Sequence, residues 1–188
     1  DEAELIYELG MELIVTDHHQ VGDVLPKAEA VVTPHRADDS SFDGYCGAGV
    51  AFRLVCALED GDNDFMTEQY GDIAALATIG DIVPLVSENR KIVKNGLSLI
   101  SNTNRPGLAS LIELSGASNG VMNSNAVAYR LVPRINAAGR FSNAELAVEL
   151  LKSEDMEEAN ALCAELCETN EKRRAEEVEI FDKIEKQI

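Results

Sequence analysis

The chain has 188 residues, of which 45% are hydrophobic, and it carries a formal net charge of −18. Such a chain is long and apolar enough to bury a core, but its apolar runs stay short of the roughly 18 residues that a membrane span needs. The start of the chain is acidic, which is not typical of a secretory signal, so we expect a cytoplasmic protein without membrane contact. A charge of this sign also argues against nucleic-acid binding over the whole surface, because Lys and Arg dominate contacts with the phosphate backbone.

The first elements predict part of a parallel sheet. A helix with an apolar face covers residues 3–9 and ends at Gly10. The strand 13–16 follows, and its uncharged sequence Leu-Ile-Val-Thr predicts burial on both faces. A second strand, 30–33, stops at Pro34. Two parallel strands make a poor sheet by themselves, so we expect a fragment of a larger α/β protein with further strands upstream.

The tripeptide Asp17-His18-His19 follows the first strand directly. Parallel sheets bind ligands at the carboxyl ends of their strands, and a carboxylate with two imidazoles can hold a divalent cation there. A polar turn is the alternative. Two of the three histidines of the chain meet at this point, which favours a functional site.

Helices dominate from residue 46 onward. The segment Gly47-Ala48-Gly49 opens a helix that Gly61 ends. It lacks the third Gly of a dinucleotide fingerprint and the Lys of a P-loop, so close helix packing is at least as good an explanation as phosphate binding.

Asp81 interrupts a small, apolar stretch that runs from residue 73 to 85. Gly80 and Pro84 place it on a loop at a helix end, where a helix cap is the alternative to a functional role. A carboxylate is disfavoured at the C-terminal end of a helix, so we expect a positive partner, and a metal ion would serve.

Further helices are expected over residues 87–101 and 106–116, and from Ser124 to a stop before Pro133. The piece 133–140 is predicted to be a loop, in which small residues let a ligand approach while Arg134, Asn136 and Arg140 bind phosphate. Ser142 and Glu145 form a capping box for the next helix, whose N-terminus favours an anion. Alternatively, the arginines pair with nearby acids.

Charge is unevenly distributed along the chain. Residues 88–141 contain 7 basic and 2 acidic residues, whereas the segments on both sides are strongly acidic. The basic residues of this middle block are candidates for a phosphate-facing surface, with an ordinary solvated face as the alternative: Arg90, Lys91, Lys94, Arg105, Arg130, Arg134 and Arg140.

The last segment, 153–188, has neither Gly nor Pro and predicts one long acidic helix that connects domains or packs on something absent. Within it, Cys163 and Cys167 are four residues apart on one helix face. We expect core thiols there, because the chain has no Cys-x-x-Cys pair typical of zinc sites.

These motifs together resemble a known family. Thr16-Asp17-His18-His19 resembles the motif of the DHH phosphoesterase superfamily, and three later segments resemble its RecJ branch of single-strand-specific 5′ to 3′ exonucleases in the family's order. They are Cys46-Gly47-Ala48-Gly49-Val50-Ala51-Phe52, then Gly80-Asp81-Ile82-Val83-Pro84-Leu85 with Glu88-Asn89-Arg90, then Pro133-Arg134-Ile135-Asn136-Ala137-Ala138-Gly139-Arg140.

The resemblance implies a role for each matching residue. His18 would bind one of two Mn²⁺ or Mg²⁺ ions, Asp81 would be the carboxylate of the last metal motif, His19 would contact the scissile phosphate, and Asp17 would orient the histidines. Arg134, Asn136 and Arg140 would lie near single-stranded DNA, the expected partner. The implied function is metal-dependent exonucleolytic hydrolysis of that DNA in repair and recombination.

The family pattern also has parts without a counterpart in this chain: an early Asp-x-Asp, a further Asp before the DHH strand, and a glycine-rich C-terminal domain. We therefore expect an internal fragment, with the rest of the sheet subdomain in residues 1–45, a helical part in 46–152 and a connecting helix in 153–188. The fragment by itself should be inactive. The alternatives are another DHH phosphoesterase, acting on oligoribonucleotides, cyclic dinucleotides or pyrophosphate, or a nonenzymatic scaffold with a degenerate DHH fold.

Overall fold

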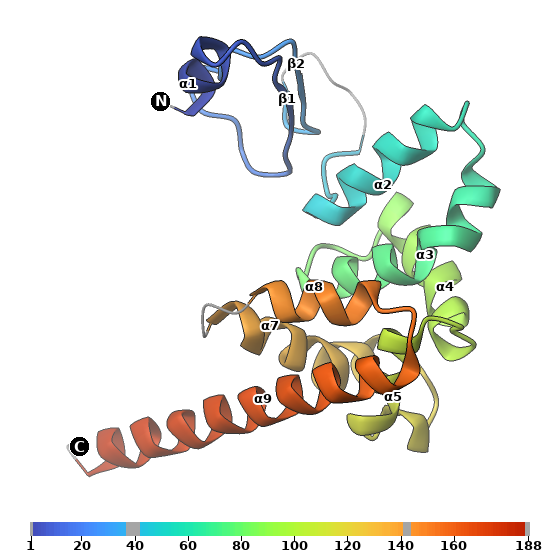
Figure 1. The fold of residues 1–188 in the computed structure, drawn as a ribbon, viewed down its shortest axis with the longest axis vertical. Coiled ribbons are helices and arrows are strands. Elements are labelled where there is room, and N and C mark those ends of the chain that lie inside the picture. The colour runs from blue at the N-terminus through green and yellow to red at the C-terminus, as the bar shows by residue number, and fades with distance from the viewer. Residues whose placement is uncertain (1, 37–41, 141–143, 187–188) are drawn as a thin grey trace. The chain divides into compact units, whose positions relative to one another are not determined.

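The computed structural model describes residues 2–36, 42–140 and 144–186. Contacts along the chain divide it into two compact units, residues 1–96 and 97–188, which we call unit 1 and unit 2. Figure 1 shows that both strands and the first helices belong to unit 1, and that the long helix α9 belongs to unit 2. The finer division at residues 45 and 152 stays a prediction.

Unit 1 begins with the predicted helix and parallel strand pair. The helix α1 (Glu2–Glu8) is followed by Gly10 with a φ of 74°, a left-handed conformation that glycine adopts readily. Strand β1 (Ile14–Thr16) pairs in parallel with β2 (Ala30–Val32), and Val15 lies opposite Val31. An α/β fold with about two parallel strands and a mainly helical remainder is therefore confirmed.

The expected burial of the first strand on both faces is wrong for this structure. Ile14 is 64% exposed, and Val32 on the neighbouring strand is 40% exposed. The described residues form only two strands, and the helices beside them do not cover both faces. Apolar composition correctly indicated a parallel strand, but burial depends on the cover that other elements supply.

Helices α2 (Gly47–Leu58) and α3 (Asn63–Gly80) pack against each other in unit 1. Their facing side chains are buried: Val50, Phe52, Cys56, Met66, Ala74, Ala75, Leu76 and Ile79. Cys46 caps α2, because its Sγ accepts the N–H of Gly49 at 3.3 Å, and it lies 3.6 Å from Thr78 Oγ1. This contact ties the start of α2 to the end of α3.

Helix α4 (Ser87–Ser101) contains the boundary between the two units and approaches α3 closely. A Cβ atom built on Gly96 would lie 2.3 Å from the carbonyl oxygen of Gly71 and 2.2 Å from Cβ of Ala75. Real Cβ atoms do not come so close to other heavy atoms. Glycine at this position therefore permits the observed distance between α3 and α4.

Unit 2 is helical throughout its described part. Its elements are α5 (Pro106–Leu114), η1 (Ala117–Asn119), α6 (Ser124–Ala126), the π-helix η2 (Val127–Leu131), α7 (Val132–Arg140), α8 (Ala144–Lys152) and α9 (Met156–Glu185). Helices α5, α7 and α8 pack on α9. The core of the unit includes six fully buried aliphatic side chains, Leu108, Leu111, Val127, Leu131, Leu150 and Leu166.

The predicted helix stop before Pro133 is wrong, and so is the predicted loop over residues 133–140. Pro133 is the second residue of α7, and the π-helix η2 leads directly into it. The N–H of Val132 donates to the carbonyl of Val127, which makes the preceding turn wide. Proline is tolerated in the first turn of a helix, where its missing N–H costs little, and the wide turn leaves room for its ring. The predicted capping residue Ser142 lies outside the described residues.

Helix α9 is the long C-terminal helix that the sequence predicts, but it begins three residues later than expected. Asp155 caps it by accepting the N–H of Glu158 at 2.8 Å. Its first half buries a face formed by Ala159, Cys163, Leu166 and Asn170. The apolar side chains of its second half are exposed, namely Val178, Ile180, Phe181 and Ile184. No described helix combines the length and apolar content that a membrane span requires.

Candidate metal centre

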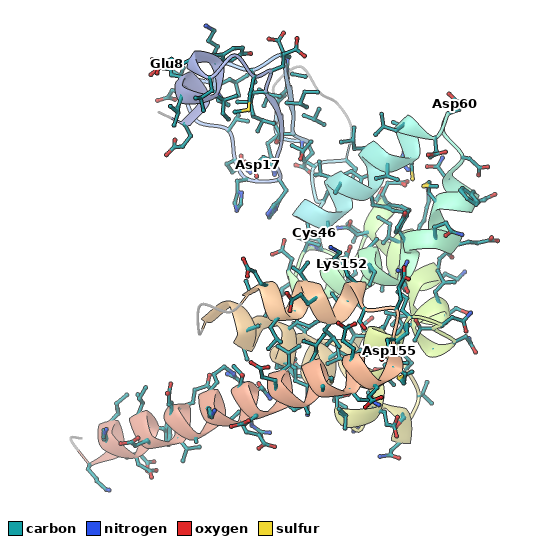
Figure 2. All side chains as sticks on the ribbon, in the orientation of Figure 1. Glu8, Asp17, Cys46, Asp60, Lys152 and Asp155 are labelled. Carbon is teal, nitrogen blue, oxygen red and sulfur yellow. The ribbon has the colours of Figure 1, made fainter. Side chains whose placement is uncertain are left out.

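Asp17 lies at the point where the parallel ladder ends. Its N–H still donates to the carbonyl of Val32 at 3.0 Å, so the sheet holds its backbone in place. Figure 2 labels its side chain at the end of β1. One carboxylate oxygen, Oδ1, accepts both the backbone N–H of His18 at 2.7 Å and Nδ1 of His19 at 2.8 Å. The sheet thus positions Asp17, and Asp17 in turn positions the two histidines.

The hydrogen bond from the His19 ring lowers the pKa of the Asp17 carboxyl, and the backbone N–H groups of His18 and His19 lower it further. The carboxylate therefore stays ionised to a lower pH than a free Asp side chain. Because an ionised carboxylate only accepts hydrogen bonds, Nδ1 of His19 must carry a proton in this arrangement. Nε2 is then the ring nitrogen that His19, 76% exposed, presents to a ligand.

His18 occupies the most enclosed position of the tripeptide. Its side chain is 21% exposed, and a Cβ atom built on Gly47 at the start of α2 would lie 3.5 Å from its Cδ2 atom. Its ring centroid lies 4.2 Å from that of His19. On the other side, Nδ1 of His18 is 3.8 Å from Oδ2 of Asp81. Three elements, β1, α2 and α3, therefore meet around His18.

Asp81 caps the C-terminal end of α3, as the sequence predicts. Its N–H donates to the carbonyl of Ala77 at 2.9 Å, and its side chain is 45% exposed. The next residue, Ile82, has a φ of 59° and is 89% exposed. A β-branched residue is strained in this left-handed region, so the chain turns sharply after Asp81 at an energetic cost. The imidazole of His18 is the neighbour of the Asp81 carboxylate, and the expected metal partner of Asp81 stays a prediction.

The donor set fits a divalent cation. Among the described residues, Asp17, His18 and His19 form a cluster of metal-binding side chains whose ligand atoms lie within 4.8 Å of one another. Two bonds of about 2.1 Å, the length usual for Mg²⁺ and oxygen, can also span the 3.8 Å between Nδ1 of His18 and Oδ2 of Asp81. Carboxylates suit both Mg²⁺ and Mn²⁺, whereas imidazole is a softer ligand that favours a transition metal.

The glycines in the first turn of α2 support close packing more than phosphate binding. Gly49 is buried, and a Cβ atom there would lie 3.2 Å from the ring of Tyr45. Gly47 faces the ring of His18, as described above. Both positions bring the backbone of α2 close to neighbouring side chains, so the Gly-Ala-Gly segment acts on the centre through the placement of His18.

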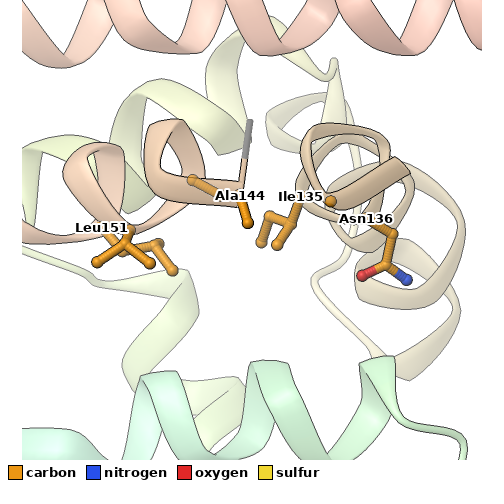
Figure 3. A pocket seen from close by; sticks show the side chains of 7 residues that line it. Ile135, Asn136, Ala144 and Leu151 are labelled. Carbon is orange, nitrogen blue, oxygen red and sulfur yellow. The ribbon is translucent and has the colours of Figure 1, made fainter. Parts of the chain in front are cut away.

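The expected substrate-binding residues lie in unit 2, on the helix α7 instead of a loop. Asn136 is exposed and lines an open groove of about 440 Å³ between α7 and α8, together with Ile135, Gly139, Ala144, Ala147, Val148 and Leu151. Figure 3 shows Ile135 and Asn136 on one side of this groove and Ala144 and Leu151 on the other. The side chain of Arg140 lies outside the described part of the chain.

The described hydrogen bonds of Arg134 go to a thiol and a backbone carbonyl, and not to an acidic side chain. Its Nε donates to Cys167 Sγ at 3.2 Å, and a terminal N–H donates to the carbonyl of Arg130. Arg130 in turn donates to the carbonyl of Gly116. These arginines therefore connect segments of unit 2 by hydrogen bonds. Neither the predicted phosphate contact nor the alternative of pairing with acids included these bonds. The basic middle block is divided between the units, since Arg90, Lys91 and Lys94 belong to unit 1.

The four cysteines are free thiols, as expected. Cys163 is fully buried, and this burial, with the neighbouring Cys167 as a second cause, raises its pKa to about 12. A thiol that stays protonated is a poor metal ligand and a poor nucleophile. Cys163 is therefore a core residue of unit 2.

Comparison with known proteins identifies a family for the first part of the chain. Residues 1–78 match the profile of the DHH family, N-terminal domain. The chain is 44% identical over 174 residues to the single-stranded-DNA-specific exonuclease RecJ of Bacillus subtilis, an alignment that covers 92% of this chain and 22% of that protein.

Solved RecJ structures match this chain over nearly its whole length. A structure titled exonuclease RecJ bound to manganese has a TM-score of 0.88 and 39% identity, covering 99% of this chain and 47% of the other. RecJ from Thermus thermophilus in complex with Mn²⁺ has a TM-score of 0.86 and 39% identity, covering 97% and 27%. The chain thus spans between about a fifth and a half of the length of the relatives it matches.

Proposed function

We propose that this chain contributes part of the metal centre of a single-stranded-DNA-specific exonuclease that works from the 5′ end. The observation that carries the proposal is the approach of Asp81 to the DHH tripeptide, with Oδ2 only 3.8 Å from Nδ1 of His18. These two groups are far apart in the sequence and come from different elements. The similarity to RecJ exonucleases over 92% of the chain supports single-stranded DNA as the substrate.

Each residue of the centre has a distinct role. His18 and Asp81 would hold the cation, and the ring of His18 is kept in place by its contacts with Gly47 and His19. His19 faces the solvent with Nε2 and contacts the scissile phosphate. Asp17 holds His19 by its Nδ1–H and so sets which nitrogen faces the substrate.

Two divalent cations, Mn²⁺ or Mg²⁺, would supply an activated water and charge stabilisation for the hydrolysis of a phosphodiester. Similar RecJ structures are titled as complexes with Mn²⁺ and with Mg²⁺, and the imidazole in the centre makes Mn²⁺ the better candidate. Of the described residues, the tripeptide and Asp81 offer too few donors for two cations. We therefore expect the 188-residue chain by itself to bind Mn²⁺ weakly and to leave DNA intact.

The other proposed substrate contacts are in unit 2. Asn136 presents its amide in the open groove between α7 and α8 and is accessible to a nucleotide. Arg140 follows on the same helix. Arg134 uses its guanidinium within the unit, so we assign it an indirect role in holding α7 against α9. With DNA as substrate, we place the activity in the cytoplasm and in DNA repair and recombination.

The test uses the full open reading frame and 5′- or 3′-labelled single-stranded DNA with Mn²⁺. We expect stepwise loss of nucleotides from the 5′ end, and at least about a 100-fold loss of turnover in the variants His18→Ala and Asp81→Asn, because each removes a direct ligand. His35→Ala is the matched histidine control, since His35 contacts Gln20 outside the cluster. Unchanged turnover in either ligand variant removes that residue from the centre.

A substrate panel separates the related activities. Single-stranded DNA should be degraded faster than oligoribonucleotides, cyclic dinucleotides and pyrophosphate under the same conditions. A protein that prefers one of the latter three is a different DHH phosphoesterase. A protein that binds no Mn²⁺ and turns over none of them is a scaffold.

A further inference from the structure

Asn89 is a buried polar residue to which the proposed chemistry gives no role. It lies in the first turn of α4 and is 0% exposed. Its face of α4 continues with the buried Ile92 and Val93 and with Gly96, which contacts α3, so Asn89 occupies a core position of the helix. An amide at such a position is costly unless its hydrogen bonds are made.

The amide nitrogen of Asn89 joins two distant segments. Nδ2 donates to the carbonyl oxygen of Gly44 at 2.6 Å and to that of Pro84 at 3.0 Å. The first carbonyl precedes the start of α2 and the second belongs to the loop that follows α3. A single side chain therefore spans the two segments by using both of its N–H groups.

Both segments lead directly to the metal centre. Three residues after Gly44, Gly47 lies against the ring of His18, with its Cβ position 3.5 Å from Cδ2. Three residues before Pro84, Asp81 places Oδ2 at 3.8 Å from Nδ1 of the same ring. A shift of either segment would change the position of His18 relative to Asp81.

The loop between α3 and α4 also needs an external constraint. Ile82 and Ser87 have φ values of 59° and 46°, and a left-handed conformation is unfavourable for both residues. Strained backbone of this kind persists only when surrounding contacts hold it. The bond from Asn89 to Pro84 lies between these two residues and supplies such a contact.

We infer that Asn89 is a positioning residue for the metal centre, which holds the loop of Asp81 and the segment before Gly47 in register so that His18 and Asp81 bind one cation. The inference rests on the proposed function in one respect, namely that the centre binds a divalent cation. Asn89 does not touch the metal, because its side chain is fully buried and its Nδ2 is engaged with two backbone carbonyls. Its Oδ1 is also buried and has no hydrogen-bond partner among the described residues.

The decisive variant is Asn89→Leu in the full open reading frame, since leucine has the same number and branching of side-chain heavy atoms but cannot donate to Gly44 and Pro84. The control is Asn170→Leu, which replaces another buried asparagine, on α9 in unit 2, where it accepts from Arg173. Mn²⁺ affinity is measured from the electron paramagnetic resonance signal of free Mn²⁺. Thermal unfolding in EDTA reports stability, and kcat and KM are measured on single-stranded DNA.

We expect Asn89→Leu to weaken Mn²⁺ binding at least about 10-fold, as the loss of an indirect support of a metal ligand does, and to lower kcat more than it raises KM. Added Mn²⁺ should restore part of the lost rate. Asn170→Leu should lower the unfolding temperature while leaving Mn²⁺ affinity within twofold of the wild type. Asn89→Ser, which retains one donor, replaces the leucine variant if the latter does not fold.

A folded Asn89 variant with unchanged Mn²⁺ affinity overturns the inference, and so does an equal loss of affinity in Asn170→Leu. Failure of the proposed function has a different result. In that case the wild-type protein binds Mn²⁺ but leaves single-stranded DNA intact, and the Mn²⁺ affinities of the variants still decide the role of Asn89. A wild-type protein that binds no Mn²⁺ contradicts both.

Discussion

Replacement of Gly107 by alanine tests the closest helix approach in unit 2. Gly107 lies in the first turn of α5, and a Cβ atom built there would be 1.7 Å from the carbonyl oxygen of Leu150 and 2.6 Å from its carbonyl carbon. Both atoms belong to the backbone of α8, so no side chain can rotate away. The helices must separate by at least about 1.3 Å before this contact reaches 3.0 Å, below which real Cβ atoms are essentially never found.

The expected cost follows from this displacement. Added methyl groups in packed cores typically cost 1–3 kcal/mol, and we expect about 3 kcal/mol or more here because the obstacle is backbone. The neighbouring side chains Leu108, Leu111 and Leu150 are fully buried and would lose packing as α5 moves. For a cooperative unit of about 90 residues, a loss of this size lowers the unfolding temperature by about 12 °C or more.

The assay is thermal unfolding followed by circular dichroism, with Gly139→Ala as the control. Gly139 lies in α7, and a Cβ atom there meets nothing within 4 Å. Alanine is a better helix former than glycine, so the control should raise stability by a few tenths of a kcal/mol. An unchanged unfolding temperature in Gly107→Ala would refute the close approach of α5 and α8. A comparable loss of stability in Gly139→Ala would show that the space around the added methyl group does not explain the effect.

Two further predictions concern α9. With its pKa raised to about 12, the Cys163 thiol is almost entirely protonated at pH 8, so iodoacetamide should label it only after denaturation, as peptide mass spectrometry can measure; labelling in the native protein as fast as that of a free thiol would contradict its burial. Removal of the N-cap by Asp155→Ala should cost about 1 kcal/mol in urea unfolding, whereas Asp155→Asn should retain most of the cap. Equal losses in the two variants would show that charge, and not the hydrogen bond to Glu158, matters.

Local patterns in the sequence predicted most of the elements. Gly10 after α1, the uncharged run of β1 and Pro34 after β2 act within a few residues of their positions, so their effects can be inferred without the rest of the fold. The same holds for Asp81, because Gly80 and Pro84 on either side limit it to a helix end. The tripeptide Asp17-His18-His19 was recognisable as a metal-binding group for the same reason: all its donors lie together in the sequence.

Tertiary contacts decided the points that the sequence did not. The local sequence predicts a helix stop before Pro133, yet the π-helix before it leads into α7 with Pro133 as the second residue. The sequence predicts Arg134 as a phosphate ligand, but the fold directs its Nε and one terminal N–H to the sulfur of Cys167 and the carbonyl of Arg130. Such outcomes depend on partners many residues away, which no local pattern contains.

The same distinction between local sequence and tertiary contacts applies to the candidate metal centre. The sequence indicated which residues are candidates for metal binding, because Asp17, His18 and Asp81 are distinctive in their own surroundings. Only the fold brought Asp81 to within 3.8 Å of His18, with Gly47 packed on the same ring and Asn89 bonded to both adjoining segments. A distance of this kind is set by the packing of α2, α3 and α4 on one another, and packing is a property of the whole unit.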